Sequence, residues 1–254
     1  MNAGRFAGRA ALVTGAARGI GGATAARLAR EGAQVLLLDV LPEVEETARA
    51  IGQPFLLLDV AEPGAGEQAV AAALMTFGKL DILVNNAGIS GSRPLVECDD
   101  TLLDRIIGTN LMAVLRMTRA AIPHITRPGG KIVSVASVFG IAGYPGSTPY
   151  AAAKAGVAQM TRQLSADLAG EGIAVNAVAP GLIETAMTTQ RLHGDAYYQA
   201  AMLRPTPARR AGQPEEVAAV IAFLASDDAS YVSGEVIAVD GGWLTGRHPP
   251  RGDL

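Results

Sequence analysis

The sequence has one cysteine, few aromatic residues and no cluster of basic side chains. Cys98 stands alone among the 254 residues, so no intramolecular disulfide can form. Aromatic residues make up 4% of the chain and the formal net charge is −3. Without a lysine- or arginine-rich stretch, the chain has no electrostatic footprint for nucleic acid, and we expect no nucleic-acid partner.

Long apolar runs and metal-ligand patterns are also missing. No run approaches the ~20 apolar residues that a bilayer-spanning helix needs, and the first residues carry none long enough for a signal peptide. We therefore expect no membrane association and a cytoplasmic location. The three histidines, His124, His193 and His248, have no ligand partner at useful spacing, so no metal site is predicted.

Short apolar runs instead alternate with longer amphipathic segments along the whole chain, of which 49% is hydrophobic. This alternation predicts an α/β protein made of βαβ units around one parallel sheet, with residues 1–254 forming a single domain. The predicted strands are residues 10–13, 35–38, 55–58, 82–84, 131–135, 174–178 and 236–239. The predicted helices are residues 20–31, 65–77, 102–122 and 151–168, with another starting near Pro214.

Two segments interrupt the alternation. Residues 185–210 separate the sixth predicted strand from the helix near Pro214, and they are too long for an ordinary connection. Because long loops in compact domains are usually functional or disordered, we interpret them as a substrate lid. Residues 245–254 are rich in proline, glycine and charge, and we interpret them as a tail.

The segment TGAARGIG, residues 14–21, follows the first predicted strand and opens the first predicted helix. Its glycines allow tight turning and close approach by a pyrophosphate, whose charge the helix N-terminus favours. Asp39 closes the second strand 18 positions beyond Gly21, near the spacing of about 20 typical of an acid that binds the adenosine ribose. Together these features indicate a dinucleotide site.

Asp39 also bears on the choice of cofactor. A 2′-phosphate beside it would meet a like charge, and two unit charges about 4 Å apart repel by up to roughly 4 kcal/mol at an effective dielectric near 20. We therefore expect NAD rather than NADP. Arg18 instead favours NADP, because a basic side chain in the loop can contact a phosphate.

Tyr150 and Lys154 are four residues apart, and therefore on one face of a predicted helix. Free tyrosine has a pKa of about 10, and a nearby cation favours its phenolate. Bringing that pKa toward 7 requires about 4 kcal/mol. We expect Lys154 and an oxidised nicotinamide ring to supply it together.

With these residues in place, the whole chain resembles the short-chain dehydrogenase/reductase family. The resemblance rests on several modest signatures that occur in a fixed order. They are residues 14–21, Asp39, Asp59 with Val60, residues 85–88, Asn110, Ser137, Tyr150 with Lys154, Pro180 and Gly181 with Thr185, and Asp240-Gly241-Gly242.

The resemblance implies a Rossmann-like, doubly wound domain with a seven-stranded parallel sheet flanked by helices, assembled as a homotetramer or homodimer. It implies that Tyr150 is the acid/base and that Lys154 binds the nicotinamide ribose. Ser137 would then hydrogen-bond the reacting oxygen, and Asn110 would hold a water in the proton relay. The implied cofactor contacts are Gly15, Arg18, Gly19, Ile20, Gly21, Asp39, Asp59, Val60, Asn86, Ala87, Gly88, Tyr150, Lys154, Pro180, Gly181, Ile183 and Thr185.

The predicted activity is hydride transfer between NAD(H) and a small secondary alcohol or ketone, with sugars and polyols as open alternatives. Expected substrate contacts are residues 90–93, Val138, Phe139, Tyr144, Met187, Leu192, Tyr197, Tyr198, Met202 and Leu203. A rival reading is an NADPH-dependent 3-oxoacyl-carrier-protein reductase, which Asp39 disfavours. A non-catalytic dinucleotide sensor is a second rival, which the presence of Tyr150, Lys154 and Ser137 disfavours.

Overall fold

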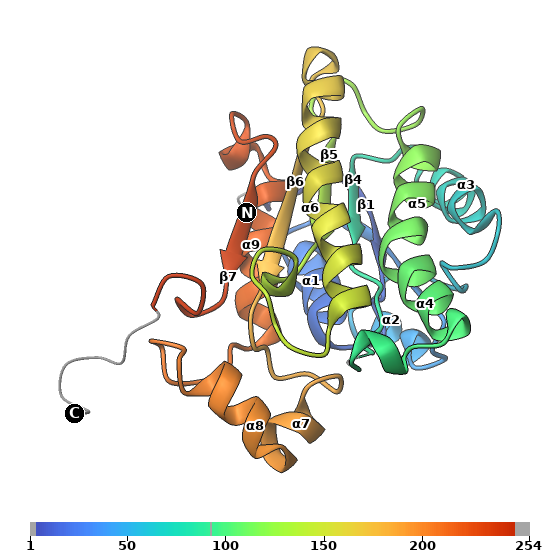
Figure 1. Cartoon of the computed structure of the whole chain (residues 1–254). Coiled ribbons are helices and arrows are strands. Elements are labelled where there is room, and N and C mark those ends of the chain that lie inside the picture. Colours follow the sequence, from blue (N-terminus) through green and yellow to red (C-terminus); the bar gives the residue numbers. More distant parts are fainter. Residues whose placement is uncertain (1–3, 92, 247–254) are drawn as a thin grey trace.

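Seven parallel strands form one sheet at the centre of the computed structural model, which describes residues 4–91 and 93–246 (Figure 1). The strands are β1 (Ala10–Thr14), β2 (Gln34–Asp39), β3 (Phe55–Leu57), β4 (Ile82–Asn85), β5 (Lys131–Val135), β6 (Ala174–Pro180) and β7 (Val236–Val239). Their order across the sheet is β3-β2-β1-β4-β5-β6-β7. The predicted α/β class and all seven predicted strands are confirmed.

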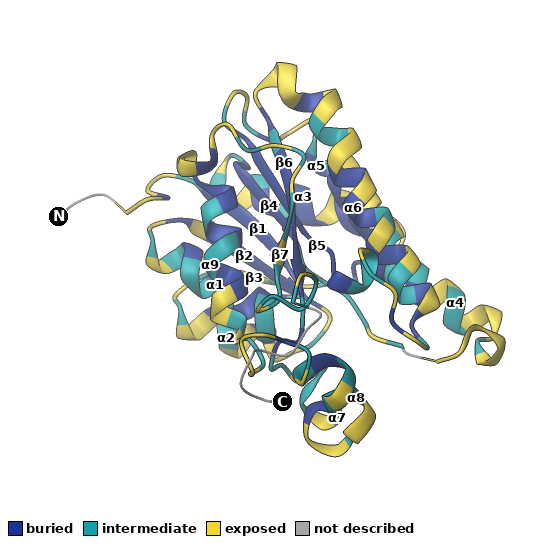
Figure 2. Ribbon diagram, turned by 60° about the vertical axis from the view of Figure 1, so that its left-hand side comes forward, coloured by how far each residue is buried: buried dark blue, intermediate teal, exposed yellow. Residues whose placement is uncertain are grey.

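Helices cover both faces of the sheet, so the inner strands are almost wholly buried, while the edge strands β3 and β7 are partly exposed (Figure 2). Successive strand residues point to opposite faces. Val13 of β1 packs in one core cluster with Leu28 of α1 (Gly19–Arg30) and Ile221 of α9 (Pro214–Ala225). Leu12, its neighbour, packs in a second cluster with side chains of α3 (Ala65–Phe77) and α5 (Ala113–Ala121). Burial on both faces explains why these strands are continuous apolar runs.

The connections leave β1 and β4 in opposite directions, because the strand order reverses between these two neighbours. In an open parallel sheet such a reversal creates a crevice outside the carboxyl ends of the strands, where ligands bind. Asp39 and Asn85 are the last residues of β2 and β4, so both lie at this edge.

The predicted helix over residues 102–122 is divided into three parts. It consists of α4 (Asp100–Ile107), a π-helical turn (Gly108–Met112) and α5. Asn110 lies in the π turn, fully buried, and its amide donates to the carbonyl oxygens of Ile106 and Ile89, each at 3.0 Å. Single π turns inside helices occur frequently at functional sites.

Residues 185–210 are not a structureless loop. They contain α7 (Thr189–Gly194), α8 (Ala196–Tyr198) and a second π-helical turn (Gln199–Leu203), which lie beneath the carboxyl edge of the sheet in Figure 1. Their apolar side chains pack with Val138, Tyr144 and Leu182, and this burial stabilises the helices. Sequence periodicity missed them because each is only one or two turns long.

The remaining helical elements complete the chain. They are α2 (Val44–Ala50), α6 (Thr148–Leu168) and the 3₁₀ turns Leu95–Glu97, Val138–Gly140, Ala169–Glu171 and Asp227–Ala229. Across residues 4–91 and 93–246, no helix combines the length and apolarity needed to cross a bilayer. Of the predicted tail only Thr245 and Gly246 are described; His248 and Ser92 lie outside the described residues.

Candidate active site

A cavity of about 900 Å³ opens at the carboxyl ends of the strands. It brings together side chains that are far apart in the sequence, from the loop after β1 to the segment after β6. The predicted site residues that line it are Gly15, Arg18, Gly19, Ile20, Asp39, Asp59, Val60, Asn86, Ala87, Gly88, Asn110, Ser137, Tyr150, Lys154, Pro180, Gly181, Ile183 and Thr185. Gly21 is the one predicted site residue that does not line the cavity.

Gly21 lies beneath the glycine-rich loop, where it permits close packing. A Cβ atom at this position would come 2.0 Å from the carbonyl oxygen of Gly15. Gly15 itself has a positive φ of 65°, and a Cβ there would come 2.7 Å from the Cα of Ala87. The missing side chain of Gly21 lets the loop close on the helix, and a direct contact of Gly21 with a cofactor stays a prediction.

The start of α1 is arranged to accept an anion. Arg18 precedes the helix in an extended conformation, its side chain makes no capping hydrogen bond, and the first turn contains no acidic residue. The first amides of a helix have no intrahelical partner, and they attract negative charge. These uncapped amides beside the cavity fit the pyrophosphate of a dinucleotide.

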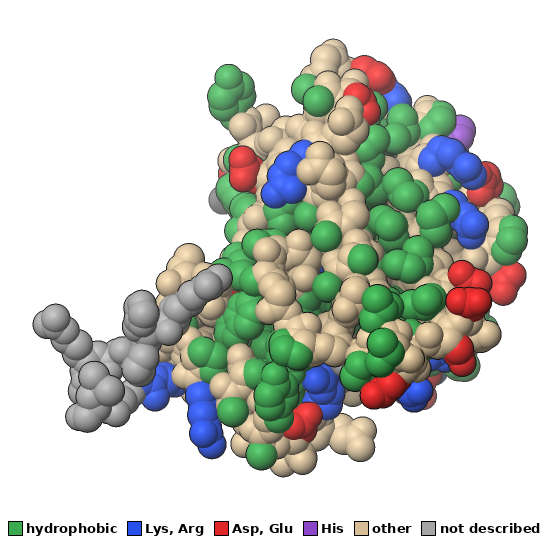
Figure 3. All heavy atoms as spheres, in the orientation of Figure 1, with side chains coloured by type: hydrophobic (Ala, Val, Ile, Leu, Met, Phe, Trp, Pro, Cys, Tyr) green, Lys and Arg blue, Asp and Glu red, His purple; other side chains and the backbone are tan. Residues whose placement is uncertain are grey.

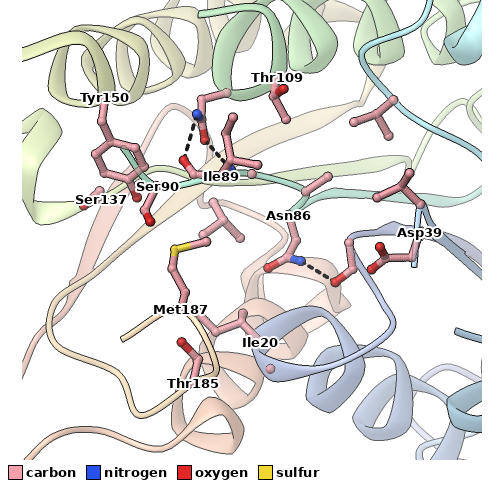
Figure 4. Close-up of a pocket in the computed structure, with 18 of the residues that line it drawn as sticks. Ile20, Asp39, Asn86, Ile89, Ser90, Thr109, Ser137, Tyr150, Thr185 and Met187 are labelled. Carbon is pink, nitrogen blue, oxygen red and sulfur yellow. Dashed lines mark hydrogen bonds between the residues drawn. The ribbon is translucent and has the colours of Figure 1, made fainter. Parts of the chain in front are cut away.

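Asn86 holds the loop in place from the neighbouring strand β4. Its side-chain amide donates to the carbonyl oxygens of Thr14 and Gly15, each at 2.9 Å (Figure 4). The Thr14 hydroxyl in turn accepts from the backbone amides of Asn86 and Ala87, each at 3.0 Å. These reciprocal bonds join the ends of β1 and β4 and leave Asn86 on the cavity wall.

Asp39 faces the cavity with only 8% of its surface exposed (Figure 4). Its carboxylate accepts hydrogen bonds from the amides of Ala17, at 2.9 Å, and Leu41, at 3.0 Å. Within the described part of the chain it forms no ion pair. The cavity therefore contains a buried negative charge that two backbone amides orient and no cation neutralises. Arg18 is exposed on the same cavity wall.

Tyr150 and Lys154 lie one turn apart near the start of α6, and Ser137 follows β5 opposite them (Figure 4). Lys154 is 3% exposed, and its ammonium donates to the carbonyl oxygen of Val135 at 2.8 Å. The ammonium nitrogen lies 5.8 Å from the centroid of the Tyr150 ring. The predicted Ser-Tyr-Lys arrangement is thus assembled in one place.

Burial sets the electrostatics of this group. Burial raises the pKa of Tyr150, and a hydrogen bond with Ser137 only partly opposes the rise. Burial also lowers the pKa of Lys154 to about 8. Desolvation thus disfavours both charged forms at once, and the lowering of the Tyr150 pKa by Lys154 together with an oxidised nicotinamide ring stays a prediction.

The Asn110 side chain is engaged by backbone groups. Its carbonyl oxygen accepts from the Ile89 amide at 3.2 Å, while its amide bonds described above hold Ile89 and Ile106. A Cβ at Gly88 would come 2.7 Å from the Asn110 oxygen and 3.5 Å from the Lys154 ammonium. Asn110 thus anchors the loop after β4 close to Lys154.

Of the expected substrate contacts, Ser90 and Met187 line the cavity beside Tyr150 (Figure 4). Leu192, Tyr198 and Met202 instead pack in a cluster with Val138 and Tyr144. His193 lies in the lid with its Nε2 atom 3.7 Å from the Glu184 carboxylate, away from the cavity lining.

Sequence reasoning missed several cavity-lining residues. They include Leu41, Ile89, Asp104, Arg105 and Thr109. Leu41 lies two residues after Asp39, and Ile89 directly follows the motif at residues 85–88. Closeness to these motifs could have identified both. Asp104, Arg105 and Thr109 reach the cavity only because α4 folds over it, and no local pattern marks them. Within the described residues no cluster of three histidine, cysteine or acidic side chains suited to a metal is present.

The fold and this site define the class of protein: an α/β oxidoreductase that binds a nicotinamide dinucleotide. The family model described as enoyl-(acyl carrier protein) reductase matches residues 15–244. The chain belongs to the short-chain dehydrogenase/reductase family and acts on an alcohol or ketone group.

Relatives within the family carry different names. The 3-oxoacyl-(acyl-carrier-protein) reductase of Thermotoga maritima is 45% identical over 94% of this chain and 98% of its own. The cis-4-hydroxycyclohexanecarboxylate dehydrogenase of Sinomonas cyclohexanicum is 43% identical over 94% of this chain and 97% of its own. Among solved structures, levodione reductase matches with a TM-score of 0.87 and 37% identity, over 93% of this chain and 98% of its own.

Proposed function

We propose that this protein is an NAD(H)-dependent dehydrogenase that interconverts a small secondary alcohol and its ketone. The observation that carries the proposal is the buried Asp39 carboxylate, which faces the cavity without a cation. An acid at this position binds the two ribose hydroxyls of NAD, whereas a 2′-phosphate would meet its charge at short range.

The cavity residues divide into groups that would hold the two ends of NAD. The amides at the start of α1 bind the pyrophosphate, Asp39 the adenosine ribose, and Asp59 the adenine. Near the reacting end, Lys154 binds the nicotinamide ribose and Thr185 the carboxamide. When bound, NAD supplies the hydride acceptor for the carbinol carbon.

The chain's own residues would handle the proton and the substrate oxygen. Tyr150 removes the hydroxyl proton during oxidation and returns it during reduction. Ser137 donates a hydrogen bond to the substrate oxygen and orients it. Asn110 holds a water that passes the proton onward. Because burial raises the pKa of Tyr150, the positive charge of the oxidised ring must add to that of Lys154 before the phenolate forms.

Cofactor preference is the direct test. We expect kcat/KM with NAD to exceed that with NADP by ~100-fold or more, and Asp39→Asn to reduce the ratio at least ~10-fold, because the substitution removes the charge and keeps the shape. Arg18→Gln is the matched control, since it removes the basic side chain on the same wall and should widen the preference. A wild-type preference for NADP would overturn the proposal.

The second candidate is an NADPH-dependent 3-oxoacyl-carrier-protein reductase. It is favoured by the name of the Thermotoga maritima relative, by that of the Escherichia coli relative, which is 41% identical, and by Arg18 on the cavity wall. Reduction of a 3-oxoacyl thioester by NADPH, faster than any oxidation of a simple alcohol with NAD, would establish this candidate instead.

We also infer that copies of the chain associate as a homotetramer or homodimer. Hydrophobic side chains gather on the surface over α5 and α6 (Figure 3). Met112 and Leu115 are 37% and 38% exposed there. Apolar patches of this kind mark interaction sites. Light scattering of the purified protein distinguishes the assembly from a monomer, which would refute the inference.

A further inference from the structure

The lid begins at a turn beside the cavity that contains Thr185, Thr188 and Thr189. Thr185 and Thr188 line the cavity, and α7 starts at the next residue, Thr189. The backbone amides of Thr188 and Thr189 donate to the carbonyl oxygen of Thr185 at 3.0 and 2.9 Å. The Thr189 hydroxyl donates to the same oxygen at 2.7 Å. The backbone of the turn is therefore closed around Thr185.

The segment before the turn is attached to the body of the protein by an isolated parallel bridge between Ile183 and Gly212. The Glu184 amide donates to the Gly212 carbonyl oxygen at 2.8 Å, and the Gly212 amide donates to the Leu182 carbonyl oxygen at 2.9 Å. The bridge thus uses groups on either side of Ile183 and not the Ile183 carbonyl. That carbonyl oxygen accepts a hydrogen bond from the Thr188 hydroxyl instead.

The Thr188 hydroxyl uses its whole hydrogen-bonding capacity within the turn. A hydroxyl has one proton to donate and two lone pairs that accept. Thr188 gives its proton to the backbone, where the Ile183 carbonyl oxygen accepts it and the Thr185 carbonyl oxygen lies at 3.3 Å. Its oxygen accepts from the Thr185 amide at 3.1 Å and lies 3.2 Å from the Thr185 hydroxyl oxygen. Because the Thr188 proton is already used, the proton between the two hydroxyls comes from Thr185.

The direction of that proton decides what Thr185 offers to a ligand in the cavity. Its methyl group lies toward the glycine-rich loop, since a Cβ at Gly19 would come 3.5 Å from the Thr185 Cγ2 atom. Its hydroxyl donates to Thr188 and, within residues 4–91 and 93–246, has no other hydrogen-bond partner. Only the lone pairs of the Thr185 oxygen remain for a ligand, so Thr185 is an acceptor there.

We propose that Thr188 is a positioning residue that keeps the Thr185 hydroxyl as a hydrogen-bond acceptor for the cofactor. The inference rests on the proposed function, in which Thr185 binds the nicotinamide carboxamide. A carboxamide has a donor, its NH₂ group, and an acceptor, its carbonyl oxygen. With its proton turned toward Thr188, Thr185 accepts from the NH₂ group and disfavours the carbonyl oxygen. The start of the lid thereby selects one of the two amide orientations.

The test compares two dinucleotides that differ in this donor. NAD carries the carboxamide, whereas 3-acetylpyridine adenine dinucleotide carries a methyl ketone, which keeps the carbonyl oxygen and lacks the NH₂ group. Calorimetry measures the dissociation constant of each without turnover. Thr188→Val removes the hydroxyl and keeps the shape, and Thr188→Ser keeps the hydroxyl. Thr189→Val is the matched control, because it removes the neighbouring hydroxyl that donates to the Thr185 carbonyl oxygen.

We expect the wild type to bind the acetyl analogue ~10-fold more weakly than NAD, as the loss of one hydrogen bond predicts. In Thr188→Val the Thr185 proton loses its acceptor and can turn toward the ketone. The analogue should then bind more tightly than it does to the wild type, and the difference from NAD should fall to about threefold or less. Thr188→Ser and Thr189→Val should keep the wild-type difference. Structural damage would weaken both dinucleotides and would not strengthen the analogue.

Equal weakening of both dinucleotides in Thr188→Val, or no difference between them in the wild type, would overturn the role of Thr188. Thr185→Val gives a second measurement if Thr188→Val does not fold. It removes the hydroxyl that meets the carboxamide and leaves Thr188 in place, so it should abolish the difference. A difference that persists in Thr185→Val would also overturn the inference.

The adenosine end of the cofactor separates this inference from the proposed function. Thr188 acts at the nicotinamide end, whereas we attribute the preference for NAD over NADP to Asp39. A wild type that prefers NADP would overturn the proposed function, and the same comparison would then use NADP and its acetylpyridine analogue. A preference for NAD without discrimination against the acetyl analogue would support the proposed function and overturn the role of Thr188.

Discussion

The two ends of the sheet each bury an aspartate, and they treat it differently. At the amino end Asp81, 1% exposed, accepts from the Ala10 amide at 2.8 Å and the Thr126 hydroxyl at 2.7 Å. It also pairs with Lys79 at 2.9 Å and lies 3.8 Å from Arg9. Asp39 at the carboxyl end accepts from two amides and, among residues 4–91 and 93–246, pairs with no cation. The protein neutralises the first charge itself and leaves the second for a ligand.

Buried lysines show the same contrast. Lys131, at the start of β5, is 4% exposed; burial lowers its pKa, while the Asp227 carboxylate opposes the change. Lys154, at the other end, is 3% exposed, and only burial shifts its pKa, to about 8. Uncompensated charge at the carboxyl end is the mark of a site organised for binding rather than for stability.

The largest effect should come from a substitution at the carboxyl end of the sheet, and it should be a loss of activity rather than of stability. Tyr150→Phe removes the proton-transferring hydroxyl, so kcat/KM should fall by ~10²- to 10⁴-fold. The melting temperature should stay the same or rise, because a buried hydroxyl is replaced by hydrogen. Steady-state assays and calorimetry measure both. If Tyr150→Phe lost activity by unfolding, the claim that the carboxyl end serves function rather than stability would be contradicted.

At the amino end the equivalent change should act on stability. Asp81→Asn leaves Lys79 and Arg9 without their anion, and we expect a loss of about 3 kcal/mol in unfolding free energy, with turnover of the folded enzyme unchanged. Urea denaturation measures this. A large activity loss with normal stability would contradict it.

The loss of unfolding free energy in Asp81→Asn should depend on pH. Burial acts to raise the pKa of Asp81, but Thr126, Ala10 and Lys79 outweigh it, and the net pKa is lowered. The carboxylate therefore contributes stability above its ordinary pKa of 3.8, and this contribution disappears as pH falls through the lower folded value. The wild type and Asp81→Asn should accordingly converge in acid.

Lys154→Met should lose activity and gain unfolding free energy. Folding lowers the pKa of Lys154 from 10.5 to about 8, so the unfolded chain binds more protons between these values. Wild-type stability should rise with pH across that window, and Lys154→Met should lack the rise. At neutral pH the variant should gain up to about 3 kcal/mol while losing activity. Lys131→Met is the control, expected to keep activity; a lower melting temperature for Lys154→Met would contradict the argument.

The smallest effect should come from Lys79→Gln. The Lys79 side chain is 43% exposed, so water screens its pairing with Asp81. We expect a loss of about 0.5–1 kcal/mol, below that of Asp81→Asn, and no change in kcat/KM. A loss equal to that of Asp81→Asn would show that Lys79 alone neutralises the amino end.

The sequence predicted the sheet and many of the residues that line the cavity. Strands such as 35–38 were found because burial on both faces favours a continuous apolar run, and chain order then requires parallel crossovers. Residues 14–21, Asp39, Tyr150 and Lys154 were predicted because the chemistry expected of a dinucleotide site and of proton transfer constrains local spacing. Gly21 packs beneath the loop and does not line the cavity, a distinction that spacing alone does not make.

The pKa values at the site and the packing of the lid could be found only from the tertiary structure. The pKa values of Tyr150 and Lys154 depend on desolvation, which exists only after folding; burial raises the first and lowers the second. Tyr198 was expected at the substrate but packs with Val138 and Tyr144, because ring packing joins segments that no sequence period connects. Local patterns fix backbone and spacing, whereas solvation and long-range packing are properties of the folded whole.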